Sequence, residues 1–292
     1  MICTNPRRIF KNLDLDKYPQ GIEVPCGQCM NCRVKKRDEW SLRIMHESLY
    51  WDSCIFLTLT YDDEHLPKNG SLLPNDLTKF FKRLRKSIGN RKIKYFACGD
   101  YGKKERPHYH IIMFGMDFLN PDDIDIIKSC WNLCDWNMLG RLPFGNVTPQ
   151  SIRYVCRYIE SKVLGKESYY AYDLHNILPT YAVMSKGIGK NYAIDNNSKI
   201  IKELKCTALG KTYGIPRYYR KITDIPIEDI KEYGKVREIK IVEKITGNVL
   251  TREQAYNELN KDEIIKIEDA IKESNKQIEL NTQSIIDIKN RK

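Results

Sequence analysis

The chain has 292 residues, which is enough to bury one sizeable core and a smaller second part. No stretch approaches the roughly 18 uninterrupted apolar residues of a membrane span, and the first residues lack the apolar segment of an export signal. We therefore expect a cytoplasmic protein with no membrane partner. Ten cysteines in such a chain favour reduced thiols or metal ligands over disulfides.

The positive charge is concentrated in the first three quarters of the chain. The formal net charge is +11, from 49 basic and 38 acidic residues, but residues 221–292 hold 14 basic and 15 acidic ones, so residues 1–220 carry +12. A basic globular region favours a polyanionic partner, because neutralised phosphates release counterions. A merely solubilising surface would give the same count. We expect residues 1–220 to form the functional domain and residues 221–292 a charged, mainly helical appendage.

Hydrophobic spacing and capping residues predict an α+β order of helix, strand, helix, strand, strand, helix. The predicted segments are 33–50, 54–61, 75–88, 93–99, 108–115 and 149–164. Asn75 is the expected N-cap of the second helix and Gly89 its stop, while Thr148 and Pro149 start the last. This order predicts an antiparallel central sheet with helices on one face and the other face free for a ligand.

Two histidines, His108 and His110, flank one residue within a predicted strand. Alternate strand residues share a face, so the two imidazoles can bind one divalent ion. Asp100, at the end of the preceding strand, is the best third ligand. A carboxylate with two imidazoles suits Mg²⁺ or Mn²⁺ holding a phosphate oxygen. Such a histidine pair alone is more often structural than catalytic.

Two tyrosines and a lysine follow at helical spacing in the last predicted helix. Tyr154, Tyr158 and Lys162 lie at i, i+4 and i+8, so their side chains share one face. A phenol beside a metal-polarised phosphate can attack it, and the lysine can stabilise the developing charge. Arg153 and Arg157 add capacity to bind a nucleic-acid backbone. Ordinary packing is the simpler explanation for two tyrosines at this spacing.

Two weaker features complete the candidate sites. Cys26, Cys29 and Cys32, in a cysteine-rich segment over about 22–50, have the spacing of thiolate ligands, but a structural zinc needs a fourth. The fourth could be Cys3, His46 or Cys206, and three buried thiols would also satisfy the pattern. Basic residues of the predicted 75–88 helix could contact DNA or simply be solvated, and the candidates among them are Lys82 and Arg85.

The order of three segments resembles the three motifs of HUH endonucleases. These are FLTLTY at 56–61, GDYG with RPHYHII at 99–112, and YVCRYIESK at 154–162. With PCGQCMNCR at 25–33, SKGIGKNY at 185–192 and IPRYYRK at 215–221, the first 221 residues resemble the gokushovirus-type replication initiation proteins of microviruses.

The resemblance implies a rolling-circle initiator with an RRM-like or ferredoxin-like palm. Such a protein nicks one strand at the origin of a single-stranded DNA phage, stays joined to the 5′ phosphate and leaves a 3′ hydroxyl. Strand transfer later closes the circle. The implied partners are single-stranded origin DNA and the host replication machinery in the bacterial cytoplasm. The lack of a P-loop agrees with chemistry that needs no nucleotide cofactor.

The resemblance also implies roles for the candidate residues. His108 and His110 would be the metal pair, Tyr154 and Tyr158 the nucleophiles, and Lys162 a helper. The family more often has glutamate where this chain has Asp100, so Glu105 is the alternative third ligand. Two other functions stay open: a noncatalytic module that binds single-stranded nucleic acid, and an HUH nuclease of a plasmid or transposon.

Overall fold

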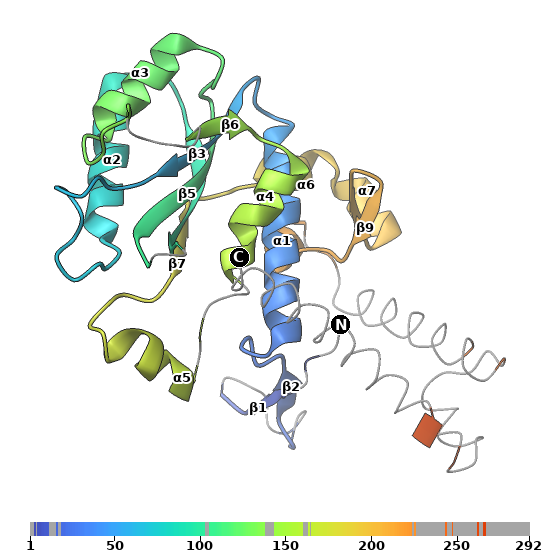
Figure 1. The fold of residues 1–292 in the computed structure, drawn as a ribbon. Helices are drawn as coiled ribbons and strands as arrows, with labels where there is room; N and C mark the ends of the chain where they lie inside the picture. The colour runs from blue at the N-terminus through green and yellow to red at the C-terminus, as the bar shows by residue number, and fades with distance from the viewer. Residues whose placement is uncertain are drawn as a thin grey trace. The chain divides into compact units, whose positions relative to one another are not determined.

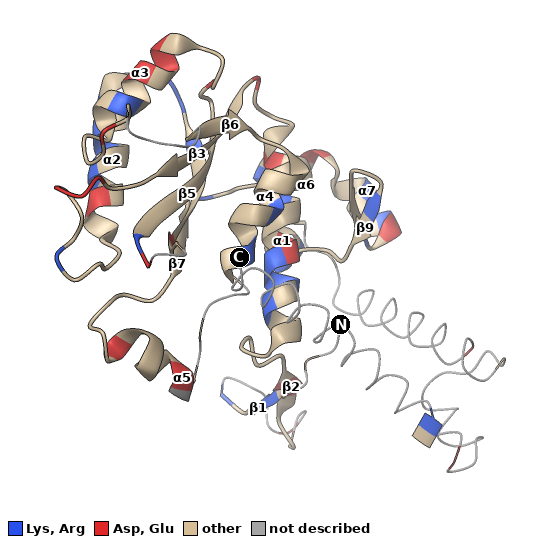
Figure 2. Cartoon of the chain, viewed as in Figure 1, with Lys and Arg blue, Asp and Glu red and all other residues tan. Residues whose placement is uncertain are grey.

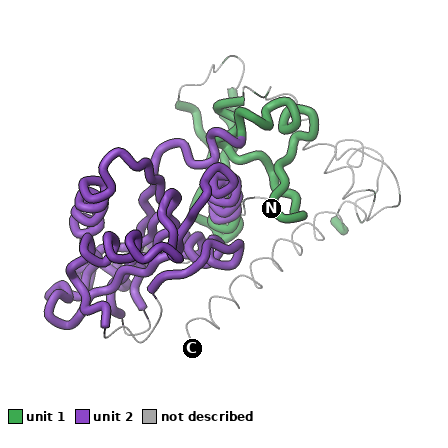
Figure 3. Tube along the Cα trace, turned by 90° about the horizontal axis from the view of Figure 1, so that it is seen from above, with its two compact units in different colours: residues 1–35, 193–291 green, residues 36–192, 292 purple. Residues whose placement is uncertain are grey.

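The computed structural model describes residues 3, 5–11, 16, 19–102, 105–137, 143–159, 163, 165–223 and 225, with single residues between 243 and 266. The chain divides into two compact units, residues 1–35 with 193–291 and residues 36–192 with 292 (Figure 3). The expected boundary at residue 220 falls within the first unit, and the expected helical appendage lies almost entirely outside the described residues. None of the described helices is both long and apolar enough to cross a membrane.

The second unit is built on a five-stranded antiparallel sheet, as expected (Figure 1). The strand order is β6-β3-β5-β4-β7, so β5 lies at the centre. The strands are β3 (Cys54–Leu59), β4 (Lys94–Tyr101), β5 (Pro107–Phe114), β6 (Phe144–Asn146) and β7 (Tyr181–Met184). β4 and β5 form the predicted hairpin pair, with Asp100 opposite His108, and β3 places Thr58 opposite His110.

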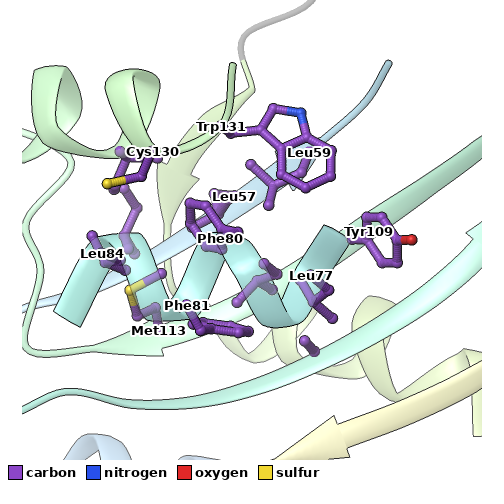
Figure 4. Packing of buried hydrophobic residues seen from close by; sticks show 14 of the residues in the cluster. Leu57, Leu59, Leu77, Phe80, Phe81, Leu84, Tyr109, Met113, Cys130 and Trp131 are labelled. Carbon is purple, nitrogen blue, oxygen red and sulfur yellow. The ribbon is translucent and has the colours of Figure 1, made fainter. Parts of the chain in front are cut away.

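Helices α2 (Pro74–Ser87) and α3 (Pro121–Cys130) cover one face of this sheet (Figure 1). The residues between them form the main core, which Figure 4 shows around Phe80, Leu84 and Trp131. The sheet contributes every second residue of its strands, including Leu57, Tyr109 and Met113. Because these residues point toward α2 and α3, their neighbours along each strand point to the opposite face.

Helix α2 begins one residue earlier than expected. Its N-cap is Leu73 rather than Asn75, and no side chain caps the first turn. The Tyr109 hydroxyl instead accepts a hydrogen bond from the Leu73 backbone N–H at 2.9 Å and donates one to the Leu73 carbonyl, also at 2.9 Å. A tertiary contact from β5 therefore sets the start of α2, which no local capping signal could reveal.

The opposite face, expected to be free for a ligand, is contacted by helices α1 (Met30–Ser48) and α4 (Pro149–Cys156) (Figure 1). Trp40 of α1 packs on Phe96 of β4, with ring centroids 5.2 Å apart. The Cys98 thiol of β4 lies 3.6 Å from the Val155 carbonyl of α4 and donates to it. The sheet is thus sandwiched between helices, and α4 is held directly on the histidine-bearing face.

Helix α4 starts where the sequence predicts. Thr148 is the N-cap and Pro149 the first helical residue, and Thr148 and Ser151 form a reciprocal capping box. The α-helix ends at Cys156 and continues as one turn of 3₁₀ helix, η1 (Arg157–Ile159), rather than to residue 164 as expected. Residues 160–162 lie outside the described residues.

The remaining elements are short. In the second unit, α5 (Lys166–Ser168) and the π-helical turn η2 (Tyr169–Asp173) precede β7. The first unit contains two small antiparallel pairs, β1 (Arg7–Ile9) with β2 (Ile22–Val24) and β8 (Cys206–Ala208) with β9 (Lys211–Tyr213). Its other helices are α7 (Asn197–Glu203) and α8 (Arg217–Ile222), while α6 (Lys190–Asp195) crosses the division between the units.

Candidate active site

The two histidines lie side by side on the α4 face of the central strand. Tyr109, between them, points into the core on the other face. The Nε2 atoms of His108 and His110 are 3.0 Å apart, and the rings are nearly perpendicular, with centroids 4.6 Å apart. The convergence that strand alternation predicts is therefore present, and both Nε2 atoms face the same small volume.

The other ring nitrogen of each histidine has a partner that fixes the ring. Nδ1 of His108 lies 3.1 Å from the Arg106 carbonyl, and Nδ1 of His110 lies 3.0 Å from Oγ1 of Thr58. A carbonyl can only accept, so the His108 contact places the proton on Nδ1 and leaves the lone pair on Nε2. Metal-binding imidazoles are oriented in this way, so the pair fits a divalent ion.

Asp100 is the nearest strand neighbour of this pair. It lies opposite His108 in the β4–β5 register, where directly paired residues on one face have Cβ atoms about 5 Å apart. Its carboxylate charge also contributes, after burial, to raising the pKa of Tyr158. Glu105, the alternative ligand, is exposed in the β4–β5 loop with a positive φ of 54°. Of the two carboxylates, Asp100 is the better placed.

Helix α4 and η1 bring both predicted tyrosines onto His110. The Tyr154 hydroxyl lies 3.3 Å from His110 Nε2, while the Tyr158 ring stacks on the imidazole with centroids 5.3 Å apart and planes at 16°. Tyr158 is only 5% exposed, whereas Tyr154 is half-buried. Burial, followed by the Asp100 charge, raises the pKa of Tyr158 well above the ordinary value of a phenol. The two phenols therefore occupy different environments.

Three residues that support this arrangement were not identified from the sequence. Thr58 holds His110, and Phe56 stacks on His110 at 5.9 Å while meeting Tyr154 edge-on at 6.3 Å. Cys98, expected to be a core residue, also fastens α4 to β4 through the Val155 carbonyl. Strand alternation puts Phe56 and Thr58 on one face, but only the pairing register shows that this face is the histidine face.

The predicted DNA-contacting cations divide between the two faces of the sheet. Arg153 of α4 is exposed and Arg157 of η1 is half-buried, and both belong to the tyrosine-bearing segment. Lys82 and Arg85 are exposed on α2, whose basic outer surface Figure 2 shows, but α2 covers the face that the histidines do not occupy. Lys162 lies outside the described residues.

Four cysteines cluster in the first unit. Cys3 joins Cys26, Cys29 and Cys32, with all four sulfur atoms within 4.8 Å of one another. Of the three proposed fourth ligands, Cys3 is therefore the one that the fold brings to the group. His46 instead stacks on Tyr192, with centroids 3.5 Å apart, and Cys206 is buried at the start of β8.

The chain is similar to several phage proteins. Residues 54–163, which run from the start of β3 to just beyond η1, match a family model described as replication-associated protein ORF2. Replication-associated protein ORF2 of Spiroplasma virus 4 is 32% identical over 289 residues, covering 89% of this chain and 87% of its own. Replication-associated protein VP4 of Bdellovibrio phage phiMH2K is 31% identical, covering 73% and 71%.

A third relative is more distant. Replication-associated protein ORF4 of Chlamydia phage 1 is 27% identical over 77% of this chain and 60% of its own. No solved structure matches the chain. The family match covers the strands and helix that carry both histidines and both tyrosines, and the first relative extends over nearly the whole length. The chain therefore belongs to the ORF2 family of phage replication-associated proteins.

Proposed function

We propose that this protein initiates rolling-circle replication of a small single-stranded DNA phage by cutting one strand at the origin with a tyrosine. The observation that carries the proposal is the meeting of the Tyr154 hydroxyl with His110 Nε2, beside His108 Nε2. A protein that only binds DNA needs neither a pair of histidines with converging nitrogens nor a phenol beside them. Membership of a replication-associated family supplies the biological setting.

The donor set supports a divalent cofactor. Two imidazoles with Nε2 atoms facing each other, and the Asp100 carboxylate opposite His108, are ligands that suit Mg²⁺ or Mn²⁺. A divalent ion held by these groups would polarise a phosphate oxygen and offset the charge that develops on it. The residues around it orient the ligands: Thr58 and the Arg106 carbonyl hold the two rings.

Tyr154 is the better first nucleophile. Its oxygen forms a bond to phosphorus while the bond from phosphorus to the 3′ oxygen breaks, and the proton lost by the phenol is balanced by one gained at the 3′ oxygen. One phosphodiester replaces another, so no nucleoside triphosphate is consumed. Tyr158 is less suited to the first step, because it is buried against His110 and its pKa is raised by that burial.

Tyr158 is then available for the second step. Once the origin has been copied, its phenol cuts the regenerated site, and the freed 3′ hydroxyl attacks the Tyr154 phosphodiester to close the circle. Tyr158 has to leave its stack on His110 to react. The two tyrosines share one helical segment, with ring centroids 5.7 Å apart, so both can reach the same phosphate position in turn.

The bound strand would run along the α4 side of the sheet. Arg153 and Arg157 lie on the tyrosine-bearing segment and are placed to contact its phosphates, with Lys162 as a further helper. Lys82 and Arg85 would contribute only to DNA that continues around to the α2 side. The cut strand leaves a 3′ hydroxyl for a host polymerase in the bacterial cytoplasm.

The test uses single-stranded oligonucleotides that tile the origin region of the genome encoding this chain, with Mn²⁺ present. A 3′-labelled strand should become covalently attached to the protein, and the matching 5′-labelled strand should end in a hydroxyl that a polymerase extends. The double variant Tyr154→Phe/Tyr158→Phe should form no adduct. Tyr170→Phe, which alters a tyrosine that is 67% exposed, is the matched control and should behave like the wild type.

The histidines are tested in the same assay. His108→Ala should abolish cleavage while leaving much of the affinity for the oligonucleotide, because phosphate contacts are made elsewhere. Adducts that persist in the double tyrosine variant would overturn the proposed mechanism. Tight binding without any cleavage by the wild type would favour a noncatalytic single-stranded nucleic-acid-binding module instead.

A further inference from the structure

We propose that Cys3, Cys26, Cys29 and Cys32 bind one structural zinc ion through four thiolates, which fastens the N-terminal segment and the β1–β2 pair to the start of α1. The four sulfur atoms all lie within 4.8 Å of one another. This site is separate from the proposed nuclease centre, and nothing in the strand-cutting chemistry requires it.

Strand pairing brings the distant cysteine to the other three. β1 and β2 are antiparallel with Arg7 opposite Val24, so continuing the same register places Cys3 opposite Gln28, between Cys26 and Cys29. The Sγ atoms of Cys3 and Cys29 are 3.8 Å apart, although 26 residues separate them in the chain. The fourth ligand is thus supplied by the fold rather than by a local motif.

Backbone N–H groups point at the sulfur atoms of this cluster. The Cys26 sulfur accepts from the backbone N–H of Cys29 at 3.2 Å and of Gln28 at 3.4 Å, and the Cys26 N–H donates to the Cys3 sulfur at 3.2 Å. Gly27, with a φ of +73°, allows the tight turn that aims these groups. Donors around a thiolate offset its negative charge, as expected for sulfur ligands of a metal.

The start of α1 completes the arrangement. The Cys29 carbonyl accepts the Arg33 N–H at 3.0 Å, so Cys29 lies at the beginning of the helix and Cys32 in its first turn. The positive end of a helix dipole favours a thiolate there. A turn followed by a helix therefore presents three sulfurs, and the opposite strand presents the fourth.

The surrounding structure is too small to hold itself by hydrophobic burial. All three residues of β1 are exposed, and Glu23 in the middle of β2 is exposed as well. A two-stranded pair of this length has marginal stability in water. Small segments of this kind commonly depend on a structural metal, and four thiolates at CxxC spacing are a closed tetrahedral set for zinc. The ion would supply the stabilisation that a core supplies elsewhere.

The experiment measures metal content and thiol protection on the full chain. Protein expressed with zinc present and passed over a desalting column should retain about one zinc per chain by elemental analysis, as expected for one closed site. His108→Ala should retain that zinc, which separates this site from the nuclease centre. Cys54→Ser, which removes a free cysteine outside the cluster, is the matched control.

Cys3→Ser tests the fourth ligand. Replacing zinc by Co²⁺ should give the absorption of a tetrahedral four-sulfur site, and the Cys3→Ser protein should lose about a quarter of the sulfur-to-metal charge-transfer intensity, since one of four thiolates is gone. Its affinity for the metal should fall by on the order of tenfold or more. A Cys3→Ser protein with the wild-type spectrum and affinity would overturn the assignment of Cys3.

A measurement on the wild type alone keeps the proposal testable if a variant fails to fold. In alkylation followed by peptide mass spectrometry, the four clustered cysteines should be protected together and become reactive together when a chelator removes the zinc. Buried Cys206 is an internal control, since chelator should not change its rate. Equal labelling with and without chelator, or iron with the visible absorption of an iron–sulfur cluster, would overturn the zinc proposal and leave the nuclease proposal unaffected.

Discussion

The hydroxyl oxygen of Tyr154 lies 3.3 Å from Nε2 of His110, the same nitrogen that lies 3.0 Å from Nε2 of His108. The tyrosine comes from a helix and the histidines from the central strand, 44 residues earlier in the case of His110. The contact joins the two halves of the proposed chemistry in one small volume. It also distinguishes Tyr154 from Tyr158, which meets the same imidazole through its ring face.

This distinction predicts different outcomes for single tyrosine variants. Tyr154→Phe should reduce the rate of first adduct formation by on the order of 10³-fold or more, because it removes the proposed nucleophile. Tyr158→Phe should form the first adduct at a rate within about threefold of wild type, since the first step does not use its hydroxyl. It should fail to produce closed circles.

Single-turnover assays with a 3′-labelled origin strand measure the first step, and a substrate carrying two origin sites measures circle closure. The opposite pattern, with Tyr158→Phe inactive and Tyr154→Phe active in the first step, would reverse the assigned order of the tyrosines.

Thr58 is predicted to act through His110 rather than on DNA. Thr58→Val keeps a β-branched side chain for the strand but removes the oxygen that lies 3.0 Å from His110 Nδ1. Losing such an outer partner should weaken metal binding by about 10- to 100-fold. The variant should therefore need correspondingly more Mn²⁺ for half-maximal cleavage while approaching the wild-type rate at saturation. Thr58→Ser, which keeps the hydroxyl, should restore the wild-type Mn²⁺ dependence, and an unchanged dependence in Thr58→Val would remove Thr58 from the site.

Local patterns predicted the parts of the fold that depend on neighbouring residues. Strand alternation placed His108 and His110 on one face, and the Thr148–Pro149 pair marked the start of α4. The position of α4 on the sheet depends on contacts such as Cys98 with Val155, which join residues 57 positions apart. The start of α2 likewise depends on Tyr109, 36 residues from Leu73. Neither contact leaves a mark in local spacing.

The candidate site divides in the same way. Residue types and spacing identified His108, His110, Tyr154 and Tyr158 as candidates, whose side chains the fold brings together. Thr58 and Phe56 became recognisable only through the β3–β5 register, and Cys3 only through the β1–β2 register. Registers depend on how whole faces pack, so a single sequence constrains them weakly.

Tyr158 also predicts a change of stability with pH. Its pKa in the folded protein is raised, first by burial and then by Asp100, above the value of about 10 for an unfolded phenol. Its contribution to stability is therefore complete below about pH 10 and is lost as the pH rises further, because the unfolded chain releases this proton more readily. One such phenol lowers the free energy of unfolding by about 1.4 kcal/mol per pH unit in that range.

Urea denaturation between about pH 9 and 11.5 measures this slope, since the range brackets the ordinary pKa of a phenol. Tyr158→Phe should show a shallower fall than wild type by about the amount of one proton. Buried Tyr61 and Tyr109, whose pKa values are also raised by burial, keep part of the slope in the variant. Tyr170→Phe, at an exposed position, is the matched control. Identical slopes in wild type and Tyr158→Phe would contradict the buried, neutral state of this phenol.

Glu47 is predicted to hold the second unit together around one buried carboxylate. It is 1% exposed and accepts hydrogen bonds from Trp51 Nε1 at 2.8 Å, Lys94 Nζ at 2.7 Å and the Gly189 backbone N–H at 2.6 Å. These donors come from the end of α1, from β4 and from the segment that follows β7. Glu47→Ala should lower the free energy of unfolding by about 3 to 5 kcal/mol, because it leaves a largely buried ammonium and two N–H groups without their acceptor.

Two comparisons separate this effect from a general cost of removing a carboxylate. Glu47→Gln keeps an acceptor of the same shape without the charge and should lose clearly less stability than Glu47→Ala. Glu23→Ala removes a carboxylate whose partner is Arg8, in an ion pair with both side chains more than half exposed, and should cost less than about 1 kcal/mol. Urea denaturation followed by tryptophan fluorescence reports on the unit that contains Trp51. If Glu47→Ala cost no more than Glu23→Ala, the carboxylate would not be joining the three segments, because its donors would have found water or other acceptors without loss.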